Sequence, residues 1–309
     1  MSDLLPRVIS VNISEKVGEQ KFPVEEAEAQ IDLGLVGDAH ARNWHRQISL
    51  LAMESIKKMQ EKGLDVGPGA FAENLTTENL ELASLPVGTR LKIGESELEV
   101  TQIGKTCHVK CAIYHQVGDC VFPREGIFVK VITPGKIKPG DLIEIIPTMR
   151  VGILTLSDKG ARGEREDMSG RVIKDTLGKL AEVVKYEVIA DDPETISQTL
   201  IDWADSGQCD LILTTGGTGF GPRDNTPEAT EKVIERRVPG LPETMRAKGM
   251  EKTNRAMLSR ATAGIRGQTL IVNLPGSPKG VKENLDIIVP VLPHAIGILR
   301  GTEGECARH

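Results

Sequence analysis

The chain of 309 residues has few aromatic side chains and no excess of positive charge. Phe, Tyr and Trp together make up 3% of the sequence, and 38 Lys and Arg stand against 44 Asp and Glu, which gives a net charge of -6. Nucleic-acid binding depends on cationic side chains against phosphates and on aromatic rings against bases. We therefore expect no nucleic-acid partner.

Signals for export and membrane insertion are also missing. The N-terminal MSDLLPRVISVN has no basic segment followed by an apolar stretch, and the longest apolar run, Ile287–Leu299, is interrupted by Pro290, Pro293 and His294. We expect a cytoplasmic protein without membrane contact. Its five cysteines, an odd number, are expected to be reduced thiols.

Two segments differ in pattern, and we expect a domain boundary between residues 147 and 148. In 1–147, short alternating apolar stretches such as Leu98–Ile103 lie between Gly, Pro and Asp turns, which predicts a strand-rich domain. One helix is predicted over Ser49–Lys62 from the spacing of Leu50, Met53 and Ile56. In 148–309, strand and helix patterns alternate, which predicts a doubly wound, mostly parallel α/β sheet.

The segment 211–230 (LILTTGGTGFGPRDNTPEAT) joins an apolar strand to a glycine-rich turn and a helix start. Its glycines permit positive φ and leave backbone N–H groups open to an anion, and the positive end of the next helix adjoins them. Thr226 is expected to cap that helix, with Pro227 in its first turn. Neither G-x-x-x-x-G-K-[ST] nor G-x-G-x-x-G fits, which argues against a P-loop NTPase and a dinucleotide dehydrogenase.

Polar sequence follows each predicted strand of the second segment, and ligands bind at this edge of a doubly wound sheet. The strands end in Ser157–Lys159, Asp191–Asp192, the glycine turn, and Gly276–Ser277 before a further helix. Acids beside phosphate-binding groups favour Mg²⁺, held by Asp191 and Asp224. Alternatively these acids serve only as turn or capping residues, and the glycines form an ordinary tight turn.

The glycine segment resembles the signature of the MogA/MoaB family of molybdenum-cofactor biosynthesis proteins. The matching residues are Thr214, Thr215, Gly216, Gly217, Thr218, Gly219, Arg223, Asp224, Thr226, Pro227 and Glu228. The resemblance implies Mg²⁺-dependent transfer of AMP from ATP to molybdopterin, a homotrimer, and catalytic acids at Asp191 and Asp224. Substrate-binding residues are then expected at Ser157, Asp158, Thr215, Gly216, Gly217, Thr218, Gly219, Gly276 and Ser277. Arg223 is either a surface charge or a phosphate ligand.

The first segment resembles the MOSC family, named for the C-terminal domain of molybdenum-cofactor sulfurase. Three stretches carry the resemblance: 34–51 (GLVGDAHARNWHRQISLL), 67–80 (GPGAFAENLTTENL) and 107–141 (CHVKCAIYHQVGDCVFPREGIFVKVITPGKIKPGD). Ala72 stands where the family has glycine before Glu-Asn. The resemblance implies a β-barrel-like domain in which Cys111, or else Cys107, ligates molybdenum or carries sulfur. Arg42, His45 and Arg46 are candidates to hold the pterin phosphate.

Two other interpretations of the cysteines stay open. Cys107, Cys111, His115 and Cys120 offer four zinc ligands at spacings of four, four and five, and buried structural cysteine is the other. For the whole chain, the alternative to an adenylyltransferase is a carrier that binds molybdopterin or the mature cofactor without catalysis. Other cofactor-biosynthesis proteins or apo-molybdoenzymes are possible partners in both cases.

Overall fold

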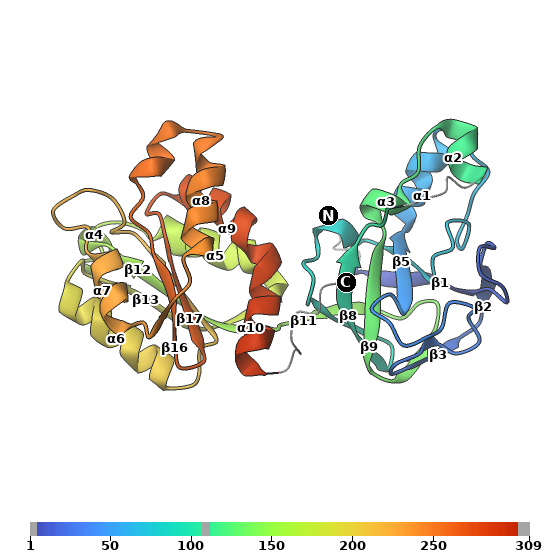
Figure 1. Ribbon diagram of the computed structural model, residues 1–309, viewed down its shortest axis with the longest axis horizontal. Helices are drawn as coiled ribbons and strands as arrows, with labels where there is room; N and C mark the ends of the chain where they lie inside the picture. Colours follow the sequence, from blue (N-terminus) through green and yellow to red (C-terminus); the bar gives the residue numbers. More distant parts are fainter. Residues whose placement is uncertain (1–4, 107–111, 302–309) are drawn as a thin grey trace. The chain divides into compact units, whose positions relative to one another are not determined.

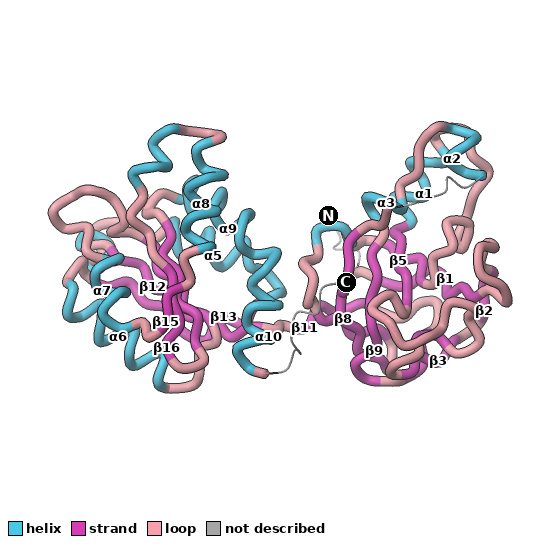
Figure 2. Tube along the Cα trace, viewed as in Figure 1, coloured by secondary structure: helices cyan, strands magenta, loops and turns pink. Residues whose placement is uncertain are grey.

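The computed structural model describes residues 5–106 and 112–301, and the chain divides into two units, Met1–Ile146 and Pro147–His309. The first unit consists mainly of strands, whereas in the second a layer of strands lies between helices (Figures 1 and 2). Among the described residues, no helix is long and apolar enough to cross a membrane.

The first unit is built on an eight-stranded sheet that closes on itself. Its strand order is β11 (Ile143–Ile146), β7 (Arg90–Ile93), β8 (Ser96–Ile103), β9 (Ile127–Thr133), β5 (Ile48–Ala52), β6 (Leu75–Glu78), β1 (Arg7–Ile13) and β2 (Phe22–Val24). A bridge between Arg7 and Leu142, next to β11, joins the sheet back to β1. The sheet thus closes between β1 and the residue before β11, while β2 stays at an edge. The expectation of a strand-rich domain is confirmed.

A smaller sheet and short helices complete this unit. The three-stranded sheet has the order β10 (Gly135–Ile137), β3 (Ala27–Gln30) and β4 (Gly34–Leu35), and the helices are α1 (Met53–Gln60), α2 (Ala112–Val117), α3 (Phe122–Glu125) and a 3-10 turn at Leu82–Ser84. The predicted helix over Ser49–Lys62 is wrong in its first residues. Ile48–Ala52 is a fully buried strand between β9 and β6, so Leu50 faces the core from a sheet, not from a helix.

The second unit contains a six-stranded sheet of mixed direction. Its order is β13 (Ala181–Ile189), β12 (Met149–Leu156), β14 (Leu211–Thr215), β17 (Thr269–Leu274), β16 (Ala263–Arg266) and β15 (Arg236–Arg237). The first four strands are parallel, and β16 and β15 are antiparallel additions at the edge. The mostly parallel sheet predicted from sequence is thus confirmed.

Helices cover both faces of this sheet, as Figure 1 shows. They are α4 (Asp158–Ala161), α5 (Met168–Leu177), α6 (Pro193–Asp205), α7 (Thr226–Val233), α8 (Gly240–Met250), α9 (Pro278–Ile288) and α10 (Leu292–Arg300), with 3-10 turns at Gly178–Leu180, Asn254–Leu258 and Val289–Val291. The strands alternate between two cores. On β14, Leu211 and Leu213 pack with α5, α9 and α10, while Ile212 packs with α6 and α7.

Candidate functional site

The four parallel strands end at one edge of the sheet, and the chain changes direction of winding there. The strand β12 lies between β13 and β14, which follow it in sequence on opposite sides. Such a switch point opens a crevice beyond the carboxyl ends of the strands. The crevice lies between Ser157, after β12, and the glycine turn, after β14.

The glycine turn requires glycine because neighbouring backbone and side-chain atoms lie close to it. Gly216 and Gly217 have φ of +102° and +62°. A Cβ at Gly216 would overlap the carbonyl oxygen of Leu156, and one at Gly217 would overlap the hydroxyl of Thr226. Only glycine satisfies both the left-handed backbone and the lack of space.

Thr226 supports this turn in a way the sequence did not predict. The N-cap of α7 is Asn225, which makes no side-chain cap, so the expectation of an N-cap at Thr226 is wrong. Thr226 is buried in the first turn, and its hydroxyl donates to the carbonyl oxygen of Gly216 at 2.8 Å. Its N–H donates to the carbonyl oxygen of Gly217 at 3.2 Å. Thr226 therefore closes the glycine turn onto the start of α7.

Two cavities meet at the glycine turn. The first, which we call the acidic compartment, has a volume of about 490 Å³, and its lining includes Glu166, Asp167, Asp191 and Asp224. It also includes predicted substrate-binding residues: Ser157, Thr215, Gly216, Gly217, Gly276 and Ser277. The structure thus brings together residues from the ends of β12, β13, β14 and β17.

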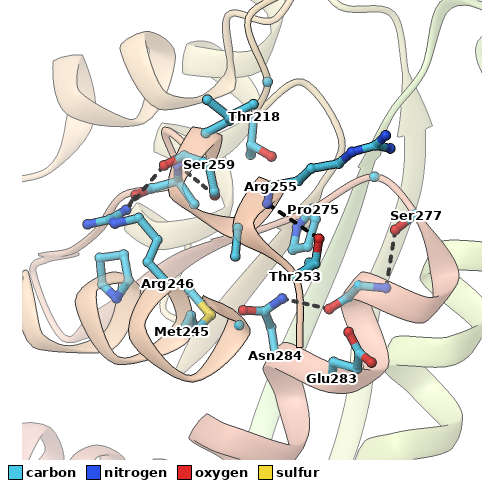
Figure 3. A pocket seen from close by; sticks show the side chains of 18 of the residues that line it. Thr218, Met245, Arg246, Thr253, Arg255, Ser259, Pro275, Ser277, Glu283 and Asn284 are labelled. Carbon is cyan, nitrogen blue, oxygen red and sulfur yellow. Dashed lines mark hydrogen bonds between the residues drawn. The ribbon is translucent and has the colours of Figure 1, made fainter. Parts of the chain in front are cut away.

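The second cavity, the basic compartment, has a volume of about 460 Å³ (Figure 3). Its wall is formed by α8, the 3-10 turn after it and α9, and four cationic side chains line it: Arg246, Lys248, Lys252 and Arg255. Thr218 and Gly219 line this compartment. Both compartments share Gly217, Asp224, Gly276 and Ser277. A ligand that spans the junction therefore contacts both predicted anion sites.

Asp191 is held by a reciprocal pair of hydrogen bonds. Its Oδ2 accepts from the N–H of Asp158, and Oδ1 of Asp158 accepts from the N–H of Asp191, each at 3.1 Å. Burial raises the pKa of Asp191 above its usual value, and the nearby charges of Asp158 and Asp224 add to the rise. Arg223 binds Asp158 at 2.7 Å. Asp158, a predicted substrate-binding residue, is not among the lining residues of either compartment, and its contacts are with Asp191 and Arg223.

Asp224 shapes the far end of the glycine turn. Its Oδ2 accepts from the N–H of Gly221 at 2.7 Å, and its own N–H donates to the carbonyl oxygen of Gly221 at 3.0 Å. The turn therefore folds around this carboxylate, which also lines both compartments. By contrast, Asp192, next to Asp191 in sequence, caps α6 and accepts from the N–H of Thr195 at 2.9 Å.

The predicted hydroxyl ligands also have structural partners. Ser157 and Ser277 cap α4 and α9, accepting from Gly160 and Gly280 at 3.1 and 3.2 Å. The hydroxyl of Thr215 donates to the carbonyl oxygen of Pro275 at 2.7 Å, which ties the end of β14 to the end of β17. These side chains fix the rim of the crevice, and the two serines lie at helix N-termini, where anions bind.

The two acids fit a cation that arrives with a phosphorylated ligand. Among the residues that the structure describes, no group of three or more His, Cys, Asp or Glu side chains is arranged to hold a metal ion. A nucleotide-bound Mg²⁺ needs only one or two carboxylates, because phosphate oxygens and water complete its shell. Asp191 and Asp224 line one compartment, and the charge of one affects the pKa of the other. This donor pair suits Mg²⁺.

Sequence reasoning missed the basic wall and Arg260. The four cationic residues of the basic compartment follow no motif, because their meeting with the glycine turn depends on how α8 packs. Arg260 lies in the segment after the 3-10 turn and contacts the glycine turn from outside the cavity. A single arginine about forty residues away from its partners leaves no local signal in sequence.

In the first unit, the candidate phosphate ligands Arg42 and Arg46 lie at one indole ring. The guanidinium carbon of Arg42 lies 3.8 Å from the ring centroid of Trp44, and that of Arg46 lies 5.8 Å from it. Arg46 also donates to Gln102 at 2.8 Å and to His45 at 3.2 Å. The structure therefore brings Arg42, His45 and Arg46 together. Cys107 and Cys111 lie outside the described residues, as does any zinc site that needs them.

Lys21, Asp38 and His40 form a group of charged and polar side chains in the first unit. Lys21 pairs with Asp38, and both side chains are 1% exposed. Burial lowers the pKa of Lys21. Burial also acts to raise the pKa of Asp38, but hydrogen bonds with His40 and Lys21 outweigh it and keep that pKa low.

The Ala-Glu-Asn motif closes a turn beside this group. Ala72 has a φ of +62°, the left-handed region that favours the glycine of the related motif. Glu73 is fully buried and accepts from the N–H groups of Gly69 and Phe71 at 2.6 and 3.1 Å. The hydroxyl of Thr76 also donates to it, at 2.9 Å. This motif therefore has a structural role.

Comparison with known proteins gives matches for both units. Residues 152–294 match the model of a probable molybdopterin binding domain, and residues 37–144 match that of the MOSC domain. The chain is 43% identical over 157 residues to the molybdopterin adenylyltransferase of Helicobacter pylori, covering 50% of this chain and 89% of that protein. It is 43% identical over 154 residues to the enzyme of that name from Pyrococcus furiosus, covering 48% and 90%.

A solved structure of the molybdopterin biosynthesis enzyme MoaB from Thermus thermophilus has 55% identity, covers 50% of this chain and 97% of that chain, and has a TM-score of 0.48. The residues matched by the first family model contain all the strand ends of the crevice, and those matched by the second contain Arg42 and Arg46. The chain therefore belongs to the molybdopterin-binding family that includes the molybdopterin adenylyltransferases, and it carries a MOSC domain ahead of that domain.

Proposed function

We propose that the second unit transfers AMP from ATP to molybdopterin. The observation that carries this proposal is the meeting of an acidic and a basic compartment at one glycine turn. An adenylyl transfer has two phosphorylated substrates, and only one of them brings Mg²⁺. Compartments of opposite charge give each substrate a separate place and let their phosphates meet between them.

The acidic compartment is assigned to ATP. The backbone N–H groups of the glycine turn and the N-terminus of α9 at Ser277 bind its phosphates. Asp191 and Asp224 would hold Mg²⁺, and the metal would supply neutralisation of the negative charge on pyrophosphate. Without the metal, these carboxylates would repel the nucleotide, so the two are expected to bind together.

The basic compartment is assigned to molybdopterin. Lys248, Lys252 and Arg255 supply positive charge for its phosphate and sulfur groups. Glu283, on α9, also lines this cavity (Figure 3), and its carboxylate lies 3.5 Å from the ammonium of Lys252. This carboxylate is suited to accept from the N–H edge of the pterin. A molybdopterin bound in this orientation directs its phosphate toward Ser277 and the glycine turn.

In the proposed reaction, an oxygen of the molybdopterin phosphate attacks the α-phosphorus of ATP. A phosphoanhydride bond forms, and the bond from the α-phosphorus to the bridging oxygen breaks, so pyrophosphate leaves with the electron pair. No protein nucleophile is required. The residues of the crevice act by positioning the two phosphates and by neutralising charge.

For the first unit we propose binding or sulfuration of the cofactor, with Cys111, or else Cys107, carrying sulfur or ligating molybdenum. Arg42 and Arg46, which lie against Trp44, would hold the pterin phosphate. A homotrimer, a cytoplasmic location and delivery to other cofactor-biosynthesis proteins or apo-molybdoenzymes are further parts of this proposal.

The test is release of pyrophosphate from Mg²⁺-ATP on addition of molybdopterin. We expect release by the wild type and its loss in Asp224→Asn and Asp191→Asn. Asp192→Asn is the matched control, because this acid is adjacent in sequence but caps α6. Tight molybdopterin binding with no pyrophosphate from the wild type would refute the enzyme and favour a cofactor carrier.

A further inference from the structure

Among the residues that the structure describes, Arg260 makes all of its side-chain hydrogen bonds with the segment 219–228. Its main-chain N–H donates to the carbonyl oxygen of Thr218 at 3.0 Å, and its Nε donates to that of Gly219 at 2.6 Å. Its Nη2 donates to the main-chain oxygen of Asp224, and its Nη1 to the carboxylate of Glu228 in the first turn of α7. One guanidinium thus joins the two ends of the loop 219–224 to the helix that follows.

The loop itself has few other restraints. It contains Gly219 and Gly221 on either side of Phe220, whose side chain is 70% exposed. Within it, the described residues show two hydrogen bonds, both between Gly221 and Asp224. From outside, Arg223 pairs with Asp158 at 2.7 Å, and the amide of Asn225 donates to the carbonyl oxygen of Arg223 at 3.3 Å. Glycines widen the range of accessible backbone conformations, so the part of the loop around Phe220 depends on outside contacts to keep one shape.

The chemistry of arginine suits this contact. A guanidinium is planar and presents its donors in fixed directions, so it can bind several oxygens at once without adjusting. Here it binds the main-chain oxygens of the loop and not the carboxylate of Asp224. That carboxylate is left at the junction of the two compartments, where it forms part of both linings.

We propose that Arg260 is a positioning residue for the adenylyl transfer, which holds Thr218 and Asp224 in the geometry that the reaction needs. This inference rests on the proposed function of the second unit. Arg260 contacts neither substrate in it and acts through the loop alone.

The residues beside Arg260 link the same segment to the basic compartment. The main-chain oxygens of Ser259 and Ala261 accept from Nη1 of Arg246 at 3.5 and 3.0 Å (Figure 3). Arg246 lies on α8 and lines the basic compartment. The segment 259–261 therefore fixes the loop that carries Asp224 relative to the wall that faces the second substrate.

The test compares Arg260→Ala and Arg260→Lys with Arg237→Ala. Arg237 is a matched control because it also pairs with a glutamate of α7, Glu231, and does not touch the loop. We expect kcat to fall about 100-fold in Arg260→Ala, since misplacement of about 1 Å costs a factor of this size. The KM for molybdopterin should be unchanged. Arg260→Lys should recover only part of the rate, because an ammonium cannot bridge both ends of the loop.

Added guanidinium should restore part of the activity of Arg260→Ala and none of that of Asp224→Asn, an outcome that general destabilisation would not produce. Amide hydrogen exchange supplies a readout independent of catalysis. We expect faster exchange in 218–225 for Arg260→Ala and no change for Arg237→Ala. If the wild type releases no pyrophosphate, the proposed function fails, and exchange still tests the loop. Unchanged exchange, or unchanged kcat in an active enzyme, would overturn the role of Arg260.

Discussion

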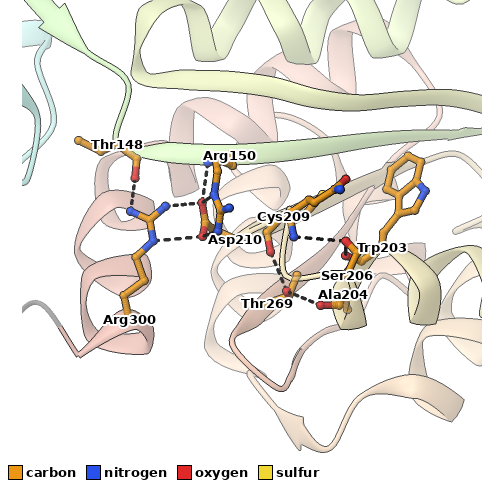
Figure 4. Close-up of polar contacts among 10 residues, drawn as sticks. Thr148, Arg150, Trp203, Ala204, Ser206, Cys209, Asp210, Thr269 and Arg300 are labelled. Atoms are coloured by element: carbon orange, nitrogen blue, oxygen red, sulfur yellow. Dashed lines mark hydrogen bonds and ion pairs between the residues drawn. The ribbon is translucent and has the colours of Figure 1, made fainter.

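Asp210 offers the clearest quantitative test of how the second unit is stabilised. Its side chain is 5% exposed and binds two arginines (Figure 4). Arg150 donates from its main-chain N–H at 2.7 Å, from Nε at 3.1 Å and from Nη2 at 2.8 Å. Arg300, at the end of α10, donates to Asp210 and also to the carbonyl oxygen of Thr148 at 2.9 Å. One buried carboxylate thus fastens the last described helix to the first strand of this unit.

The free energy of unfolding that is lost on replacing either arginine can be estimated, because both bind the same carboxylate. A hydrogen bond to a charged group contributes about 1.5–3 kcal/mol, so we expect Arg300→Ala and Arg150→Ala each to cost about 2 kcal/mol. In the double variant the buried charge keeps only the main-chain N–H of residue 150. Removing the last charged partner of a buried ion is more costly, so the double variant should exceed the sum by about 1–2 kcal/mol.

The effect depends on pH in a defined direction. Burial acts to raise the pKa of Asp210, but hydrogen bonds from Arg150 and Arg300 outweigh it and lower that pKa in the folded state. The stabilisation is therefore present above the ordinary aspartate pKa and is lost as the pH falls through the folded-state pKa. The excess cost of the double variant should accordingly be present at neutral pH and diminish in acid.

Urea unfolding followed by tryptophan fluorescence measures these costs. Trp203 is 3% exposed in α6 and reports on the second unit when Trp44 is replaced by Phe. The glycine turn lies at the opposite end of β14 from Asp210, about 20 Å along the strand at 3.3 Å per residue. We therefore expect kcat to be unchanged in Arg300→Ala. The argument would be refuted if the losses of unfolding free energy in Arg150→Ala and Arg300→Ala simply added in the double variant. It would also be refuted if the extra loss in the double variant persisted in acid.

Three further predictions concern single residues. Ala72→Gly should stabilise the first unit by about 0.5–1 kcal/mol in urea unfolding. Glycine removes the strain of the left-handed backbone, and this gain exceeds the conformational entropy that glycine adds to the unfolded chain. Gly217→Ala should abolish pyrophosphate release, since the new Cβ overlaps Thr226. Gly207→Ala is the control: this glycine also has a positive φ but open space around it, so the substitution should lower the free energy of unfolding by only about 1 kcal/mol and leave activity intact. Glu283→Gln should raise the KM for molybdopterin in steady-state assays and leave that for ATP unchanged.

The sequence predicts those parts of the second unit whose causes are local. The glycine turn, the helix that begins after Gly276–Ser277 and the polar strand ends depend on residues next to one another, so their patterns are visible. The start of α1 was misplaced because Leu50 has helical spacing with Met53 and Ile56 by coincidence. Burial in a strand decided the outcome, and burial is a property of the whole sheet.

In the candidate site, too, some features follow from local sequence and others from tertiary packing. The anion-binding side of the crevice follows from strand ends, which converge wherever a sheet is parallel. The basic wall and Arg260 depend on tertiary packing, because α8 and the segment 259–261 reach the glycine turn only after the helix and the edge strands pack. Sequence therefore suggests what the site binds, while its second wall and the support of its loop become visible only in the structure.

The raised pKa of Asp191 links the fold to the proposed use of Mg²⁺. Burial, with the charges of Asp158 and Asp224, raises this pKa, and Arg223 opposes the rise. A carboxyl group whose pKa is higher in the folded state favours folding more as the pH falls, so the ionised form is destabilising at neutral pH. A bound cation offsets that cost, and cation binding requires loss of the proton.

Two results should follow. Mg²⁺ with ATP should raise the Tm more at neutral pH than at pH values near the ordinary aspartate range. The acid limb of the pH–rate profile should also move to lower pH in Asp158→Asn, because one of the charges that raise the pKa of Asp191 is then removed. A stabilisation by Mg²⁺ and ATP that is independent of pH, or an acid limb that does not move, would mean that Asp191 does not hold the metal.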